Sequence, residues 1–211
     1  MADNYLEKRY AEVFGNQGRK AVKQRPSLDV LLAKNRSYRG YRKDYAVHRI
    51  QLEAMVAVNT KLASGMNAQR LRFRCITKGE DSARILSLIK LGSALPELHL
   101  PLPGSEPEAF IIVCSTCPEN PIVDIDLGIS LQSMLLKAVE MGLGGLIVRN
   151  FNPEELMKAL ELPYYPLAVL AVGKPDEEIR LVPAADGESL AYYRKDAVHY
   201  VPKLGLDSLL F

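Results

Sequence analysis

The alternation of apolar and polar residues along the chain predicts several β-strands. Residues 71–77 alternate strictly between apolar and basic side chains, which predicts a strand with one buried face. The continuous apolar runs at residues 109–114 and 166–172 have strand length and predict strands buried on both faces. A glycine turn entering a short strand is expected within residues 142–148, and one more strand or hairpin over 192–201.

Apolar residues at helical spacing predict the helices. The longest is expected over residues 124–141, where apolar side chains cover so much of the girth that a central helix, packed on several sides, is predicted. Asp124 and Asp126 would lie at its N-terminus, where the helix dipole accounts for them. Ser27 and Asn152 have the character of N-caps. One further helix is expected to open at Ser27, with Leu28, Leu31 and Leu32 as its apolar stripe, and the others are expected over residues 47–62, 81–89 and 153–161.

The first 26 residues differ in organisation from the rest. Residues 4–14 predict a short helix, and a basic link follows it. Such a helix has little to bury alone, so residues 1–26 are interpreted as an N-terminal helical arm that packs on something else. Residues 27–211 would then form the main domain.

Composition restricts the class of protein. Of 211 residues, 48% are hydrophobic and 25% are charged, as in a soluble globular domain. A formal net charge of +2 is too small to indicate nucleic acid as the main partner. No secretory signal and no membrane-spanning run is present in the sequence, so a cytoplasmic location is expected.

The basic charge is concentrated between Lys34 and Lys43, where half of the residues are basic and none is acidic. Arg36 and Arg39 stand three positions apart, so one turn can aim both at one point, with the Ser37 hydroxyl between them. Guanidinium groups bind phosphate in a bidentate manner, which favours a small anionic ligand. The alternative is a solvated charged loop.

Other familiar chemistries find no support in the pattern. The histidines His48, His99 and His199 have no ligand spacing, and each is interpreted as a surface or structural residue. Cys114 and Cys117 end a buried strand, which fits neither a redox motif nor a zinc site. The glycine run after residue 141 lacks the dinucleotide-binding pattern. We therefore predict no metal site and name no general acid or base.

Three short motifs carry a family resemblance when they are taken in order. They are Asn35-Arg-Ser-Tyr-Arg39, Ala63-Ser-Gly-Met-Asn-Ala-Gln69 and Gly142-Leu-Gly-Gly-Leu-Ile-Val-Arg-Asn-Phe151. Together with the strand that ends in Gly-Lys-Pro, they resemble the motifs of the nitroreductase family of FMN-dependent oxidoreductases. Arg70-Leu71 replaces the usual Pro-Trp of the second motif, and Arg149-Asn150 stands where many members carry glycine.

The resemblance implies an α+β fold, with a mixed, mainly antiparallel sheet flanked by helices and the 124–141 helix in the middle. It also implies an intertwined homodimer with two FMN sites at the interface, each built from both chains. The implied activity is reduction of nitroaromatics, quinones or similar small electrophiles with NADH or NADPH as electron donor. Hydride would pass alternately through flavin N5 in one pocket.

The resemblance also implies which residues bind the cofactor. The phosphate would be held by Arg36, Arg39 and Lys203, with Ser37 and Tyr38 nearby and Arg194 as a further basic residue. Ribityl or ring edges would be bound across the dimer by Ser64, Asn67 and Gln69. The ring would lie along Ile147, Val148, Arg149 and Asn150, with Arg149 stabilising the reduced, anionic flavin.

Two alternatives remain open at this point. A flavin-binding or flavin-sequestering protein without reductase turnover would carry the same motifs. A phosphate- or nucleotide-binding regulatory module could use the basic stretch without any flavin.

Overall fold

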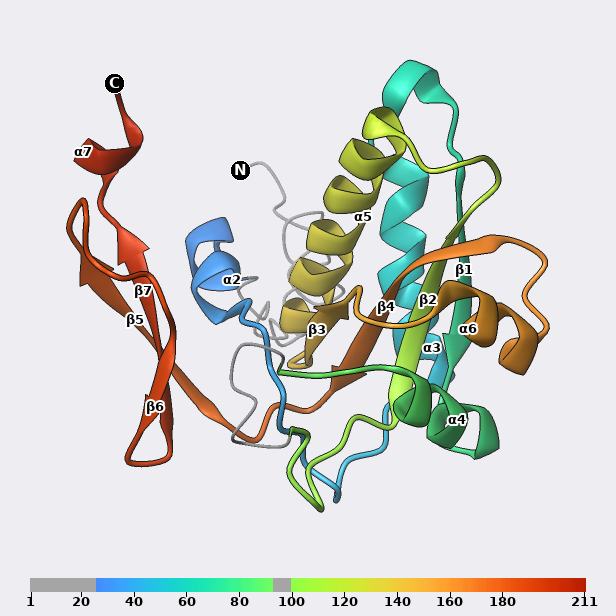
Figure 1. Ribbon diagram of the computed structural model, residues 1–211, viewed down its shortest axis with the longest axis horizontal. Coiled ribbons are helices and arrows are strands. Elements are labelled where there is room, and N and C mark those ends of the chain that lie inside the picture. The colour runs from blue at the N-terminus through green and yellow to red at the C-terminus, as the bar shows by residue number, and fades with distance from the viewer. Residues whose placement is uncertain (1–25, 93–99) are drawn as a thin grey trace, which may run out of the picture.

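The computed structural model describes residues 26–92 and 100–211, and its strands form two separate sheets (Figure 1). The larger sheet is antiparallel throughout, with the order β1-β2-β4-β3. Its strands are β1 (Leu71–Ile76), β2 (Ala109–Ser115), β3 (Gly144–Val148) and β4 (Tyr165–Gly173). The predicted helix over residues 4–14 and nearly all of the predicted arm lie outside the described residues.

The central strands β2 and β4 are buried on both faces, as the apolar runs predicted. Because side chains alternate along a strand, β2 contributes Ile111 and Val113 to one core and Phe110 and Ile112 to another. Helices α3 (Arg49–Val56) and α5 (Pro121–Glu140) cover the first core, and α4 (Glu80–Leu88) and α6 (Pro153–Leu160) cover the second. The α+β class is therefore confirmed.

Helix α5 begins three residues before the predicted start. The Asn120 side chain accepts hydrogen bonds from the backbone N–H groups of Ile122 and Val123, and Pro121 occupies the first turn. Asp126 therefore lies in the second turn, where it is buried and accepts a 2.8 Å hydrogen bond from the Gly65 N–H. The interpretation of Asp126 as a helix-terminal charge was wrong, because the cap lies further upstream.

One side of α5 is not covered within the described chain. Ile122, Ile125 and Ile129 are 41%, 62% and 39% exposed, although the rest of the helix carries many buried residues. Their spacing places them along one stripe of the helix surface. The predicted coverage is thus seen toward the sheet, α2 and α3, while an apolar stripe remains open to solvent.

The helix predicted over residues 47–62 is divided into α3 and the 3-10 turn η1 (Ala57–Lys61). Helix α2 (Leu28–Lys34) begins at Ser27 as expected, since the Ser27 hydroxyl accepts from the Val30 N–H, but α2 buries none of its residues. Helix α6 begins at its predicted Asn152 cap.

Among the described helices, none combines the length and hydropathy needed to cross a bilayer.

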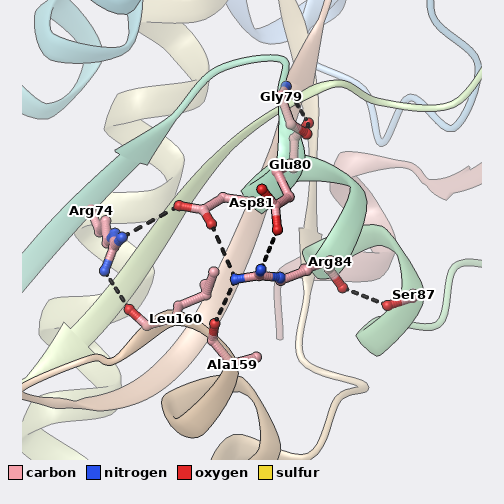
Figure 2. A network of polar contacts seen from close by, with 9 residues as sticks. Arg74, Gly79, Glu80, Asp81, Arg84, Ser87, Ala159 and Leu160 are labelled. Carbon is pink, nitrogen blue, oxygen red and sulfur yellow. Dashed lines mark hydrogen bonds and ion pairs between the residues drawn. The ribbon is translucent and has the colours of Figure 1, made fainter.

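Two arginines fasten α4 to the end of α6 (Figure 2). Arg74 of β1 bonds to the Leu160 carbonyl and lies 3.4 Å from an Asp81 carboxylate oxygen. Arg84 pairs with Glu80 and reaches the Ala159 carbonyl at 3.5 Å. This network closes the α4–α6 layer over the second core.

The second sheet was predicted only in part. The expected strand or hairpin near residues 192–201 is the pair β6 (Tyr193–Lys195) and β7 (Val198–Leu204). Strand β5 (Glu178–Ala184), which pairs in parallel with β7, was not predicted. One mixed sheet was expected. The structure instead has an antiparallel sheet and a separate mixed sheet, and the mixed sheet lies to the left of the main body in Figure 1.

Candidate functional site

The basic stretch leaves α2 and lies beside the glycine motif of β3. The N–H of Tyr38 donates a 3.2 Å hydrogen bond to the Gly145 carbonyl, and Ser37 forms a parallel bridge with Gly145. The Tyr38 ring packs against Gly144, where an added Cβ would lie 2.4 Å from a ring carbon. The first and third sequence motifs therefore form one structural unit, in which glycine leaves room for the tyrosine.

Glu177 fixes the other side of the basic stretch. Its Oε1 accepts hydrogen bonds from the backbone N–H groups of Arg39 and Gly40, and its Oε2 pairs with Arg194. The Glu177 side chain is only 7% exposed. One buried carboxylate thus holds the backbone of the basic stretch against the start of the C-terminal sheet.

A cavity of about 230 Å³ opens between the basic stretch and the C-terminal sheet. It brings together four of the predicted phosphate-binding residues, although Lys203 lies far from the others in the sequence. No carboxylate side chain lines it within the described part of the chain. The lining residues are Asn35, Arg36, Ser37, Arg39, Ile179, Tyr192, His199, Val201 and Lys203.

The arginines of this cavity are only partly satisfied. Arg36 donates a 2.6 Å hydrogen bond to the Leu32 carbonyl, and Arg39 donates a 3.0 Å hydrogen bond to the Ser37 carbonyl. The Arg39 guanidinium also lies 5.1 Å from the centre of the Tyr192 ring. Yet the Nε atoms of both arginines are buried and have no partner among the described residues. Burial lowers the pKa of the Arg36 guanidinium, which is the cost that a bound anion would offset.

Two predicted phosphate contacts lie outside this cavity. Arg194 is engaged by Glu177 and does not line the cavity. The Tyr38 hydroxyl donates a 3.0 Å hydrogen bond to the Lys34 carbonyl on the other side of the stretch. The structure therefore brings together Arg36, Ser37, Arg39 and Lys203, while Arg194 acts on Glu177.

The second motif lines a different cavity, of about 270 Å³. Ser64 and Gln69 line it together with the buried Asp126, and the Ser64 hydroxyl accepts a 3.2 Å hydrogen bond from the Gln69 N–H. Asn67 does not line this cavity, but its carboxamide oxygen accepts from Gln69 at 3.3 Å. The two cavities have no lining residue in common, so the described chain does not join the first and second motifs into one site.

The predicted ring-binding residues span the end of β3 and the two residues after it. Ile147 is 40% exposed, whereas Val148 is buried. The Asn150 carbonyl accepts a hydrogen bond from the Lys90 N–H.

Arg149 is already paired in the described chain. Its guanidinium pairs with Glu119 and lies 3.5 Å from Asp124. The hydrogen bond with Glu119 raises the pKa of Arg149. Because two carboxylates balance its charge, less of that charge is available to stabilise an anionic ring.

The comparisons with known proteins agree with this architecture. A model described as the nitroreductase family matches residues 111–174, from β2 to the residue after β4. A nitroreductase family protein from Streptococcus pneumoniae TIGR4 superposes with a TM-score of 0.60 at 16% identity, covering 73% of this chain and 93% of the other. The fold is that of the nitroreductase family.

Two further solved structures have the same nitroreductase fold. A family protein from Clostridium difficile 630 has a TM-score of 0.57 at 24% identity, covering 72% of this chain and 86% of its own. An FMN-dependent nitroreductase from Clostridium difficile R20291 has a TM-score of 0.57 at 19% identity, with coverages of 70% and 87%. No curated protein matches the sequence significantly.

Three residues around the cavity of this nitroreductase-like chain were missed by sequence reasoning. Glu177, Tyr192 and His199 belong to no motif, and nothing in their spacing indicates a site. His199, interpreted from the sequence as a surface or structural residue, is 2% exposed and lines the cavity.

Proposed function

We propose that this chain is an FMN-dependent oxidoreductase whose flavin phosphate binds in the cavity of Arg36, Ser37, Arg39 and Lys203. The observation that carries the proposal is the pair of buried, unpartnered arginine Nε atoms beside a cavity that no described carboxylate lines. Buried polar groups are normally paired, so an anionic ligand fits this site. The solved FMN-dependent nitroreductase with the same fold supports FMN as that ligand.

The protein's own groups would position the phosphate. Arg36 and Arg39 offer guanidinium donors from one loop, and the Ser37 hydroxyl lies between them. Lys203 adds an ammonium group from β7, the central strand of the C-terminal sheet. Bound FMN would supply hydride transfer at N5 between NADH or NADPH and a nitroaromatic, quinone or similar small electrophile.

We further propose that the chain works as a homodimer. In that arrangement Ser64, Asn67 and Gln69 would contact the flavin held by the partner's basic stretch, which would account for the separation of the two cavities. The exposed Ile122, Ile125 and Ile129 stripe on α5 supports such an interface, because contiguous apolar surface of this kind marks association sites. A cytoplasmic location and the boundary at residue 26 stay predictions.

Replacing Ile125 by lysine is expected to convert the dimer into a monomer, because it places a charge in the middle of the apolar stripe. Light scattering measures the mass, and a fluorescence titration measures the loss of FMN affinity that should accompany dissociation. Ile50→Lys is the matched control, since Ile50 is 74% exposed on α3 and lies outside the stripe. A monomeric wild type, or a dimer that survives Ile125→Lys, would contradict the proposed interface.

The enzymatic part of the proposal is tested by steady-state oxidation of NADH and NADPH with a quinone acceptor. The FMN-loaded protein is expected to oxidise NADH, NADPH or both. The protein stripped of flavin is expected to oxidise neither. Stoichiometric FMN binding without any oxidation would favour the flavin-sequestering alternative. Phosphate binding without flavin binding would favour the regulatory module.

A further inference from the structure

His199 faces the proposed phosphate cavity from the middle of the C-terminal sheet. It lies on β7 opposite Arg194 of β6 and lines the same cavity as the basic stretch. Its ring centre is 5.0 Å from that of Tyr192, with the planes tilted by 53°. The ring is 2% exposed, and its Nδ1 atom is buried without a partner in the described residues. Buried ring nitrogens normally have a hydrogen-bond partner, and none of the described residues supplies one here.

The charged groups around His199 come from several elements. Arg39 approaches from the basic stretch and Arg194 from β6, while Glu177 approaches from the segment before β5. Arg36 and Lys203 line the same cavity, and the Tyr192 hydroxyl lies 3.5 Å from the Arg39 guanidinium.

Cations therefore outnumber carboxylates around the ring. Burial lowers the pKa of His199 and the two arginines Arg39 and Arg194 lower it further, against an opposing effect of Glu177. These effects favour the neutral form of the His199 ring while no anion is bound.

We propose that His199 is a further binding residue for the phosphate group of FMN and that it takes up a proton from solvent when the phosphate binds. The inference rests on the proposed function, because it names an additional residue and a pH dependence for the same site. A phosphate carries close to two negative charges at neutral pH. Placed among Arg36, Arg39 and Lys203, it offsets much of the positive field that disfavours the imidazolium.

The direction of the pH dependence follows from linkage. The pKa of His199 is higher in the FMN complex than in the free protein, so binding takes up protons between the two values. The contribution of His199 to FMN affinity is complete below its pKa in the free protein. It is lost as the pH rises through the pKa of the complex.

The experiment is a fluorescence titration of FMN, and of riboflavin, against wild type, His199→Gln and His48→Gln between pH 6 and pH 8.5. At pH 6, His199→Gln is expected to bind FMN about tenfold more weakly than wild type, the effect of a charge-assisted hydrogen bond. The ratio should fall to within about threefold at pH 8.5, where the neutral ring offers only an ordinary hydrogen bond. The ionisation of FMN itself cancels in the ratio, because both proteins bind the same ligand.

The controls separate the possible outcomes. His48 is exposed at the start of α3 and does not line the cavity, so His48→Gln should match wild type at every pH. Riboflavin lacks the phosphate, so its affinity should not change in His199→Gln. Equal FMN affinities of wild type and His199→Gln, or a ratio that does not vary with pH, would overturn the inference. Failure of wild type to bind FMN at all would instead refute the proposed function.

A measurement on the wild-type protein alone covers the case in which His199→Gln does not fold. Calorimetric titrations of FMN at pH 7, in two buffers of different ionisation enthalpy, count the protons exchanged on binding. The phosphate group of unbound FMN is already mostly dianionic at this pH, so it contributes few protons to the balance. A net proton uptake by His199 is therefore expected with FMN, and none with riboflavin. Zero uptake or net release with FMN would overturn the inference.

Discussion

Replacing Arg36 and Arg39 together by alanine is expected to weaken FMN binding by at least about 100-fold. Each charge-assisted hydrogen bond to phosphate contributes about 1.5–3 kcal/mol, and about 1.4 kcal/mol corresponds to tenfold in affinity. Arg36→Ala alone should cost at least about tenfold. Fluorescence titration with FMN measures the loss. Riboflavin, which carries no phosphate, should be affected far less.

Arg42→Ala is the matched control for this result. Arg42 belongs to the same basic stretch, but it is exposed, pairs with Asp44 and does not line the cavity. Its removal should change the dissociation constant by less than about twofold, since a surface ion pair contributes little. Equal losses in Arg42→Ala and Arg36→Ala would indicate a diffuse effect of positive charge. An unchanged affinity for FMN in the double variant would instead support the alternative interpretation of the basic stretch as a solvated charged loop.

Replacing Glu177 by alanine is expected to lower the free energy of unfolding by about 3–5 kcal/mol, the usual cost of breaking a buried ion pair from one side. The Arg194 side chain is 21% exposed and would lose its counterion. The N–H groups of Arg39 and Gly40 would lose their common acceptor. FMN affinity should fall as well, because the basic stretch is no longer fixed. Urea denaturation and an FMN titration measure the two effects.

The neighbouring residue provides the comparison for Glu177. Glu178 also forms an ion pair, with Arg180, but both side chains are 57% exposed. Glu178→Ala should therefore cost about 0–1 kcal/mol and leave FMN affinity unchanged. If the two glutamates prove equivalent in the denaturation experiment, Glu177 does not organise the site.

The sequence predicted the elements whose signals are local. The apolar runs of β2 and β4 indicated strands buried on both faces because helices cover the sheet on each side. The start of α6 was predicted because Asn152 and Pro153 satisfy the first turn by themselves. Arg36 and Arg39 were expected to approach one point because they lie three positions apart in the chain, and both line the same cavity.

Features that depend on distant segments could not be predicted in this way. Strand β5 carries a proline and alternates only weakly in burial, so its parallel pairing with β7 left little trace in the pattern. Glu177 gains its importance only when Arg39 and Arg194 meet around it. His199 likewise becomes part of a site only through the fold, because the charged residues around it come from three other segments.

The role proposed for the cavity between the basic stretch and the C-terminal sheet is to bind the phosphate of FMN. Its most direct test compares the dissociation constants of FMN and riboflavin for the wild-type protein at pH 7. FMN is expected to bind at least about 100-fold more tightly than riboflavin, since at least two charge-assisted contacts are made only to the phosphate. Equal affinities for FMN and riboflavin, or no binding of either, would contradict it.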